Sequence, residues 1–311
     1  MNLHQFRFVQ EAVRRGLNLT ETAKALHTSQ PGISKAILDL EDELGVDIFV
    51  RHGKRLRRLT EPGQQVLAAV EIIMREVDNL RQIGDEYRLQ DAGSLVIAAT
   101  SSAAHYILPT ALAQLRKRLP KVRVRVIEGD VDLGLRLLRA DAADLAVLCA
   151  PVAGSDLVTL PFGAWQPMLL LPIAHPLASE ELVTLERLAA EPLLTYSRGA
   201  SGRDLLDVAC AQRGLKPTIA LETTDSALVA RYVEQGMGLG IVNELALATD
   251  SVPPHLATRS LAHLLGHGQK VVVIKRGAYL RNYVYAFAET LSEHLTRAAI
   301  TQALAEPSAQ T

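Results

Sequence analysis

Residues 28–51 read TSQPGISKAILDLEDELGVDIFVR, and this stretch contains the clearest folding pattern in the chain. Ser29 is a favoured N-cap residue, and Pro31 fits the first turn of a helix, where a missing N–H costs little. Apolar residues then recur at helical spacing until Gly45, which predicts a helix with one buried stripe. The stripe consists of Ile33, Ile37, Leu40 and Leu44. Three polar residues lie off the stripe near the helix start, namely Gln30, Ser34 and Lys35.

Two shorter helices are expected before this one. Apolar residues at helical spacing predict the first over residues 3–13, and Thr20 is expected to cap a second that runs through Leu26. A tight turn at His27–Thr28 then joins the second helix to the third, which is the helix-turn-helix pattern. In that motif the start of the second helix of the pair reads base edges in the major groove. The candidate DNA-binding residues here are Ser29, Gln30, Pro31, Ser34 and Lys35. The spacing alone fits equally well an ordinary helical core with polar residues facing water.

A charged hairpin is expected after the third helix. Residues 46–50 and 56–60 are β-prone and flank a charged turn over 51–55. This hairpin would form a wing whose cations contact backbone phosphates, which contributes affinity and salt dependence but little sequence choice. The candidate phosphate contacts are Arg51, Lys54 and Arg55.

Charge is distributed unevenly along the 311 residues. The whole chain has a net charge of −1, with 33 basic and 34 acidic residues. Residues 1–60 hold ten basic and seven acidic residues, and the other 251 residues hold 23 basic and 27 acidic residues. A basic N-terminal segment followed by an acidic remainder is typical of a chain whose N-terminal module binds nucleic acid. The two cysteines form no metal or disulfide pattern, the N-terminus carries no export signal, and no apolar run could cross a bilayer, so a cytoplasmic location is expected.

Residues 28–51 resemble the LysR-type transcriptional regulators, through the Ser-Gln-Pro opening, Ser34, the Leu-Glu-Asp-Glu-Leu-Gly end and the Phe-x-Arg wing. The resemblance covers the whole chain. It implies an α/β protein with an N-terminal winged helix-turn-helix, a long linker helix and a C-terminal two-lobed effector domain like a periplasmic binding protein. Within this family the chain is similar to the CysB and Cbl subgroup of cysteine and sulfur-assimilation regulators. The stretches that carry this narrower resemblance include NLTETAKALHTSQPGISK, LLTYSRGASGR and TDSALVARYVEQGMGLGIV.

The resemblance suggests the domain boundaries. The DNA-binding domain is expected over 1–60, the linker and dimerisation helix over 61–90, and the effector domain over 91–311. Lobe I would comprise about 91–163 and 269–300, and lobe II about 164–268. In the linker helix, apolar residues recur at alternating steps of four and three, the heptad spacing that lets two helices pack along each other. The alternative is a helix that packs on the core of its own chain, which requires a somewhat broader apolar stripe. The seam residues are Val66, Val70, Ile73, Val77, Leu80, Gly84 and Tyr87.

In the effector region, β-prone runs alternate with helical stretches, which predicts an α/β sheet with a ligand beyond the carboxyl ends of its strands. Three hydroxyl-rich turns occur there, at 100–102, 197–202 and 223–226, each before an expected helix. Hydroxyls and free N–H groups at helix starts suit a small anion. Each turn taken singly is better explained as an ordinary N-cap, and it is the presence of three such turns in one domain that favours an anion site. The candidate effector-binding residues are Thr100, Ser101, Ser102, Cys149, Trp165, Ser197, Ser201 and Thr224.

The subgroup resemblance implies that the hydroxyls of Thr100, Ser102 and Ser201 hold a sulfate-like anion near Trp165. Cys149 and Ala103 stand where that subgroup has a threonine and a glutamine, and both departures remove capacity to hydrogen-bond an anion. They leave open a different or larger effector, such as a sulfonate, an acetylated serine or an adenylylated sulfate. Sulfate or a molecule like O-acetylserine is expected. No metal and no other cofactor is expected.

Enzymatic sites are poorly supported. His263 and His267 are four residues apart, but no carboxylate or cysteine lies nearby in the sequence to complete a metal site. The glycine-rich run at 236–240 precedes a strand, which is the wrong context for a dinucleotide loop. The sequence therefore predicts a ligand-responsive, non-enzymatic activator of sulfur-metabolism genes that binds promoter DNA as a homodimer or homotetramer, with RNA polymerase as a further partner. The alternatives are a regulator of an unrelated pathway, and a cytoplasmic binding protein or enzyme whose N-terminal helices serve only assembly.

Overall fold

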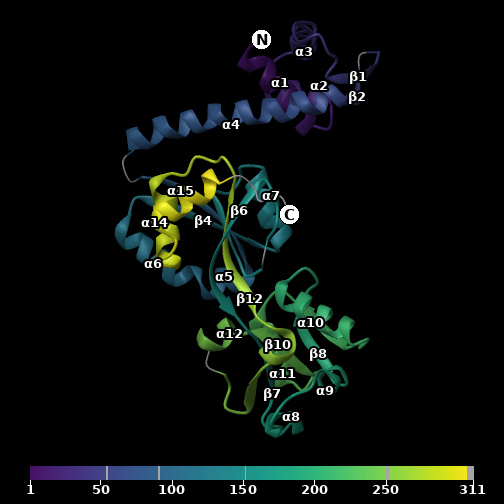
Figure 1. Cartoon of the computed structure of the whole chain (residues 1–311), viewed down its shortest axis with the longest axis vertical. Coiled ribbons are helices and arrows are strands. Elements are labelled where there is room, and N and C mark those ends of the chain that lie inside the picture. The colour runs from purple at the N-terminus through teal and green to yellow at the C-terminus, as the bar shows by residue number, and fades with distance from the viewer. Residues whose placement is uncertain (54, 90–91, 151, 250–251, 307–311) are drawn as a thin grey trace. The chain divides into compact units, whose positions relative to one another are not determined.

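The computed structural model describes residues 1–53, 55–89, 92–150, 152–249 and 252–306. Within these ranges the side chains of residues 81, 82, 85–89, 201, 248 and 249 are not described. The chain divides into two compact units, Met1–Arg88 and Leu89–Thr311 (Figure 1). Helices α1 (Leu3–Arg14), α2 (Leu19–Ala25) and α3 (Gln30–Leu44), strands β1 (Phe49–His52) and β2 (Arg55–Leu59), and nearly all of α4 (Glu61–Leu89) form the first unit.

The first unit is a winged helix-turn-helix around one apolar core. Ile33, Ile37 and Leu40 on α3 are fully buried against Phe6 and Val9 on α1. The Ser29 hydroxyl caps α3 by accepting a hydrogen bond from the Gly32 N–H at 3.2 Å, and Gly45 ends α3 in the left-handed conformation, as the sequence predicts.

Two local expectations in this unit are wrong. The N-cap of α2 is Asn18, whose side chain accepts from the N–H groups of Thr20 and Glu21, so Thr20 already lies inside the helix. The first wing strand spans 49–52 instead of 46–50. Its start is fixed by Glu41, whose Oε1 accepts from the N–H groups of Ile48 and Phe49 at 2.8 and 3.0 Å. Both errors arise because a side chain that satisfies backbone N–H groups sets where an element begins.

Helix α4 uses only part of its apolar stripe within its own unit. Val70 and Met74 are buried in the helix-turn-helix core. Ile72, Ile73 and Leu80 remain exposed, with 52%, 38% and 68% of their surface accessible. Exposed aliphatic side chains spaced along one long helix are typical of a surface that packs on another helix.

The second unit contains two five-stranded mixed sheets, here called lobe I and lobe II. The lobe I sheet has the order β4-β3-β5-β12-β6, in which β3 is parallel to β4 and β5, and β12 is antiparallel to β5 and β6. Its strands are β3 (Gly93–Thr100), β4 (Val122–Gly129), β5 (Leu145–Leu148), β6 (Leu157–Trp165) and β12 (Gly268–Lys275). The helices of this lobe are α5 (Ser101–Tyr106), α6 (Leu108–Arg118), α7 (Val131–Arg139), α14 (Asn282–Leu291) and α15 (Arg297–Ala305).

Lobe II repeats this plan. Its sheet has the order β11-β7-β10-β8-β9, with β8 parallel to β9 and β10, and β7 antiparallel to β10 and β11. Its strands are β7 (Pro167–Pro172), β8 (Pro192–Tyr196), β9 (Thr218–Thr223), β10 (Leu239–Asn243) and β11 (Leu256–Ser260). Its helices are α8 (Pro176–Ser179), α9 (Leu185–Ala189), α10 (Ser201–Gln212), α11 (Ser226–Glu234), α12 (Glu244–Thr249) and α13 (Ala262–Leu265).

The two lobes are joined by two chain crossings. One lies between β6 and β7 at Gln166, and the other between β11 and β12. Trp165, at the end of β6, is 1% exposed and packs on Gly268, the first residue of β12. A Cβ at Gly268 would lie 2.1 Å from the indole ring, so no larger residue fits there without displacing Trp165. The crossings therefore place a buried tryptophan between the lobes.

Candidate functional site

The first candidate site is the start of α3. Pro31 and Lys35 are exposed, whereas Gln30 and Ser34 are half-buried and lie on the same end of the helix. The Ser29 side chain is already engaged as the N-cap. This end of α3 therefore presents a mixed polar surface with one exposed cation, which is the chemistry that base edges and phosphates require.

The wing contains two kinds of arginine. Arg51 donates from Nη2 to Oε2 of Glu41 at 2.6 Å, and the Glu41 side chain is only 4% exposed. Arg51 thus neutralises a buried carboxylate, a role that the sequence pattern alone does not reveal. Arg55, on β2, is exposed and has no acidic partner among the described residues, as is also true of Arg57 and Arg58. Lys54, expected as a phosphate contact, lies outside the described residues.

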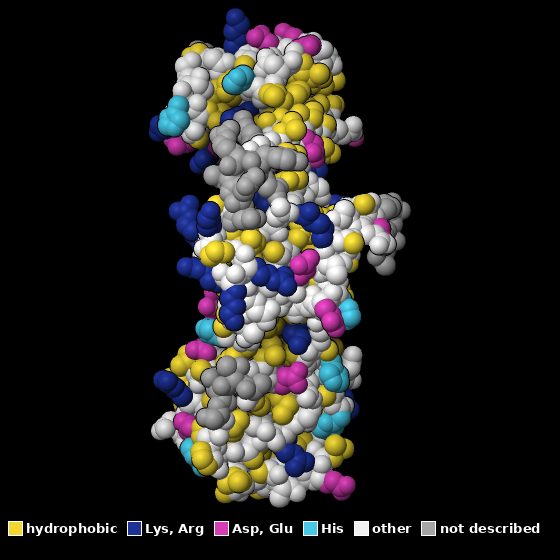
Figure 2. All heavy atoms as spheres, turned by 90° about the vertical axis from the view of Figure 1, so that its left-hand side faces the viewer, with side chains coloured by type: hydrophobic (Ala, Val, Ile, Leu, Met, Phe, Trp, Pro, Cys, Tyr) yellow, Lys and Arg dark blue, Asp and Glu magenta, His cyan; other side chains and the backbone are white. Residues whose placement is uncertain are grey.

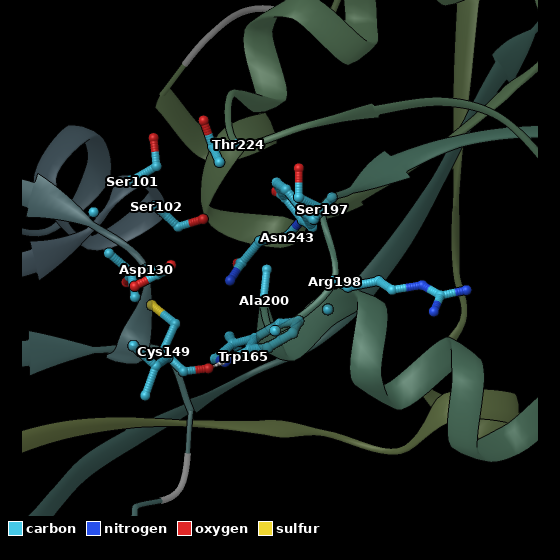
Figure 3. A pocket seen from close by; sticks show the side chains of 16 residues that line it. Ser101, Ser102, Asp130, Cys149, Trp165, Ser197, Arg198, Ala200, Thr224 and Asn243 are labelled. Carbon is cyan, nitrogen blue, oxygen red and sulfur yellow. Dashed lines mark hydrogen bonds between the residues drawn. The ribbon is translucent and has the colours of Figure 1, made fainter. Parts of the chain in front are cut away.

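The second candidate site is a pocket between the two lobes, with a volume of about 110 Å³ (Figure 3). Lobe I contributes residues from the ends of β3, β4, β5 and β6, and lobe II contributes residues from the ends of β8, β9 and β10. With the exception of the antiparallel β6, these positions follow the carboxyl ends of parallel strands, as the rule for open α/β sheets requires. The sequence-predicted residues among the lining are Thr100, Ser101, Ser102, Cys149, Trp165, Ser197 and Thr224. The Ser201 side chain lies outside the described part of the chain.

The N-terminal end of helix α10 lies at the wall of this pocket. Its N-cap is Ala200, which has no side-chain oxygen to accept from the first N–H groups. Ala200 and Gly202 both line the pocket. The helix start is held in place by Arg203, a buried residue that donates to Asp207 Oδ1 at 2.9 Å and to Glu222 Oε1 at 2.5 Å. An uncapped end of a 12-residue helix is positively polarised and attracts an anion.

Thr100 carries a buried hydroxyl with spare hydrogen-bonding capacity. The residue occupies the N-cap position of α5, yet its side chain makes no capping bond. Its Oγ1 is buried without a hydrogen-bond partner among the described residues, although the hydroxyl is near enough to lower the pKa of the Cys149 thiol. A buried hydroxyl without a full partner is costly, and a bound ligand would relieve that cost.

Hydroxyl groups also connect the two lobes beside the pocket. Across the lobes the Tyr106 and Ser226 hydroxyls are 2.9 Å apart, and within lobe II the Tyr196 hydroxyl accepts from the Asn243 N–H at 3.0 Å. Burial raises the pKa of Tyr196 to about 12, against the opposing effect of hydrogen bonds from Asn243, Ser102 and Ser226. Tyr196 is therefore a neutral phenol at physiological pH.

Cys149 is a neutral thiol in this environment. Burial raises its pKa to about 11, although Thr100 and the charge of Lys270 act in the opposite direction. Its carbonyl accepts from the Trp165 Nε1–H at 2.9 Å, which fixes the indole at the pocket wall (Figure 3). A neutral buried thiol is a poor nucleophile, so a packing role at the pocket wall fits Cys149 better than redox sensing.

Cationic side chains take little part in the pocket. Of the lining residues Arg198 is the one cation, and its side chain points away from the other labelled groups (Figure 3). Six basic residues of lobe I lie instead on or between α6 and β4, and Figure 2 shows Lys and Arg side chains on the surface of this lobe. Those residues, all outside the pocket lining, are Arg116, Lys117, Arg118, Lys121, Arg123 and Arg125.

Sequence reasoning missed three groups of the pocket, namely Tyr196, Asn243 and the turn at 129–131 that contains Asp130. Tyr196 and Asn243 are the last residues of β8 and β10, and the turn lies at the end of β4, so the strand-end rule points to all three. They lie outside the runs of hydroxyl residues on which the sequence prediction depends. Among the described residues no cluster of His, Cys, Asp or Glu could hold a metal ion, and no helix is long and apolar enough to cross a membrane.

Comparison with known proteins gives consistent matches along the chain. Residues 3–64 match the bacterial regulatory helix-turn-helix protein family named lysR, and residues 88–296 match the LysR substrate binding domain. The chain is 48% identical to the HTH-type transcriptional regulator CysB of Burkholderia cenocepacia, across 98% of this chain and 97% of that protein. It is 39% identical to the HTH-type transcriptional regulator SsuR of the same species, across 98% and 99% of the two chains.

Among solved structures, the cofactor-binding domain of the Cbl transcriptional regulator superposes with a TM-score of 0.66 at 32% identity. That match covers 70% of this chain and 95% of the other.

Proposed function

The chain belongs to the LysR family of DNA-binding transcriptional regulators, and from that membership we propose that it controls sulfur-assimilation genes in response to a small anionic effector bound between its lobes. The assignment to sulfur metabolism is supported by identity to CysB and SsuR along nearly the whole chain. The assignment of the effector is supported by the pocket. The protein would act in the cytoplasm, where promoter DNA is accessible.

One observation carries the proposal for the effector. A single cavity brings together the uncapped start of α10, the buried hydroxyl of Thr100 and the hydroxyl-bearing turns of both lobes. Neutral donors of this kind bind an oxyanion with little need for a cationic side chain. The cavity of about 110 Å³ is well below the ~300–1,000 Å³ of pockets for drug-sized ligands, so it suits a molecule of a few non-hydrogen atoms. Sulfate, thiosulfate, a short sulfonate or O-acetylserine are of that size class.

We assign the reading of DNA to the start of α3 and the wing. Gln30, Ser34 and Lys35 would contact base edges or phosphates, with Ser29 and Pro31 shaping the helix start. Arg55 and Lys54 would contact phosphates, and Arg51 would hold the wing against α3 through Glu41 while its remaining donors reach the backbone of the duplex. The exposed seam residues Ile73 and Leu80 of α4 would pair with a second copy, so that two DNA-binding units act on adjacent half-sites as a homodimer or homotetramer.

Effector binding would act on transcription through closure of the two lobes. The lining comes from both lobes, so a ligand that contacts both favours one arrangement over another. That bias can alter the spacing of the DNA-binding units and their contact with RNA polymerase, which would make the protein a ligand-dependent activator.

The test is a thermal-shift screen of the full chain with sulfate, thiosulfate, ethanesulfonate and O-acetyl-L-serine, with sodium chloride matched for ionic strength as the control. A ligand that binds the folded state raises the unfolding midpoint as its concentration exceeds its Kd. We expect at least one sulfur oxyanion or O-acetyl-L-serine to raise the midpoint in a saturable manner, and the Thr100→Val variant to lose that response. If none of the four ligands shifts the unfolding midpoint in a saturable manner, the proposed class of effector is wrong.

A further inference from the structure

We propose that Leu38 on α3 contacts the methyl group of a thymine in the major groove and thereby sets a base preference of this protein. The inference rests on the proposed function, because it requires that α3 enters the groove. It goes further in naming a specificity-determining residue and the base that this residue selects.

Leu38 is an apolar residue on the outward side of α3. Ile33 and Ile37 of the same helix are fully buried in the core, whereas Leu38 keeps 43% of its surface accessible. Residues three and four positions apart are neighbours on a helix surface, and Leu38 follows Lys35 by three positions and Ser34 by four. Leu38 therefore continues the surface strip that begins with the candidate DNA-binding residues.

The spacing along α3 keeps Leu38 within reach of the bases. A helix rises by about 1.5 Å per residue, so Leu38 lies about 4.5–6 Å along the axis from Lys35 and Ser34. Successive base pairs are about 3.4 Å apart along the duplex. A helix that places Ser34 and Lys35 in the groove would thus bring Leu38 against a base about one or two steps further on.

The chemistry of the major groove decides which base suits a leucine. Thymine presents a C5 methyl group there, whereas guanine presents two acceptors, and adenine and cytosine present donors. A leucine against guanine would remove water from N7 and O6 without replacing their hydrogen bonds, which costs free energy. A leucine against the thymine methyl buries apolar surface on both partners. Leu38 would therefore favour thymine by attraction and disfavour the other bases by desolvation.

The charges around Leu38 increase the importance of this contact. Asp39 and Asp42 are exposed on the second half of α3. Because carboxylates are repelled by phosphates, this half of the helix gains little from the backbone of the duplex. The position of Leu38 beside Ser34 and Lys35 favours a base as its partner over a surface of RNA polymerase.

The experiment removes the methyl group from the DNA and the leucine from the protein. Duplexes that bind the full wild-type chain are selected from a random pool, and deoxyuridine then replaces each thymine of a selected duplex in turn. Fluorescence anisotropy at fixed salt measures the affinity of the wild type and of Leu38→Ala for each duplex. Alanine favours the helix, and denaturation shows that the variant is folded. Leu44→Ala is the matched control, because Leu44 is the last residue of α3 and is 37% exposed.

We expect at least one deoxyuridine replacement to weaken binding of the wild type by about three- to ten-fold, as the loss of one buried methyl group would give. The same replacement should have little effect on Leu38→Ala, whose affinity for the unmodified duplex should already be reduced by a similar factor. Leu38→Gln should also lose the response to the methyl group, because glutamine pairs with adenine instead. Leu44→Ala should respond as the wild type does.

The outcomes separate this inference from the proposed function. If no replacement weakens the wild type, or if each effective replacement weakens Leu38→Ala equally, the assignment of Leu38 to a thymine is wrong while DNA reading by α3 stands. A Leu38→Ala protein that keeps its duplex affinity and loses transcription activation in vitro would also overturn the assignment, and would indicate contact with RNA polymerase. A wild type that enriches no duplex would overturn the proposed function itself.

Discussion

The hydroxyl of Thr100 gives a prediction in which stability and ligand binding change in opposite directions. Its Oγ1 is buried and lies against the Cys149 thiol, whose pKa it lowers through a weak hydrogen bond, and the residue lines the pocket between the lobes. Thr100→Val removes this oxygen and keeps the branched shape of the side chain. The free protein loses a poorly satisfied polar group, whereas the complex loses a hydrogen bond to the effector.

The two effects have different magnitudes. Leaving a buried polar group unsatisfied costs about 1–3 kcal/mol, part of which the nearby Cys149 thiol offsets, so the variant should be as stable as the wild type or more stable by up to about 1 kcal/mol. A hydrogen bond to a charged ligand contributes about 1.5–3 kcal/mol. Its loss should weaken effector affinity by about ten- to one hundred-fold.

Scanning calorimetry of the full chain measures the first effect, and isothermal titration measures the second. Thr159→Val is the matched control in the same lobe, because the Thr159 hydroxyl donates to the Val152 carbonyl at 3.1 Å. That variant should lose about 1 kcal/mol, or roughly 2–4 °C in the midpoint, and should bind the effector normally. A Thr100→Val protein that is clearly less stable than the wild type, or that binds the effector with unchanged affinity, would refute the reasoning.

Three further predictions concern other parts of the molecule. Arg51→Ala should lower the free energy of unfolding by about 2 kcal/mol, because it leaves the buried Glu41 carboxylate without its cation. Arg55→Ala should keep the stability and reduce the salt slope of duplex binding by about 0.9 per lost phosphate contact. Denaturation measures the first effect and fluorescence anisotropy at several salt concentrations measures the second, and a reversed pattern would contradict the assignment. Because burial raises the pKa of Cys149 from 9.0 to about 11, the thiol of the unfolded chain ionises first as the pH rises, and the free energy of unfolding should fall between about pH 9 and pH 11 by up to ~1.4 kcal/mol per pH unit. In denaturation series over that range, the stability of Cys149→Ala should fall less steeply than that of the wild type, and parallel curves would exclude this contribution. Gly268→Ala places a methyl group against the Trp165 ring and should lower both the calorimetric midpoint and the effector affinity. A variant that matches the wild type in both would contradict the tight packing of Gly268 on Trp165.

The helix-turn-helix was predictable because its signals are local. The Ser29 cap, the α3 stripe and Gly45 are all read from neighbouring residues, and the structure has each of them as expected. Strands β6 and β11, which lie at sheet edges, have weaker sequence signals. Pro161 and Gly163 interrupt the β6 pattern, but an edge strand tolerates such residues because its outer N–H groups need no partner.

The pocket was predictable only in part. Hydroxyl residues after strands were visible in the sequence, and the lining includes those candidate effector-binding residues whose side chains the structure describes. Asn243 and Tyr196, the last residues of β10 and β8, were not identified because they lie outside the hydroxyl-rich turns, although the strand-end rule points to them. The pairing of Arg51 with Glu41 depends on the packing of the wing against α3, which a run of basic residues does not indicate.

The central claim is that a small ligand in the pocket between the lobes alters the binding of this protein to DNA. The direct test is the affinity of the full chain for a promoter duplex, measured by fluorescence anisotropy at fixed salt with and without the ligand that gives the largest thermal shift. We expect the ligand to change the duplex affinity of the wild type by about 5- to 150-fold, and to have little effect on Thr100→Val at the same concentration, while both proteins bind the duplex equally in its absence. An equal response in the two proteins, or an unchanged affinity for both with saturating ligand, would contradict the account.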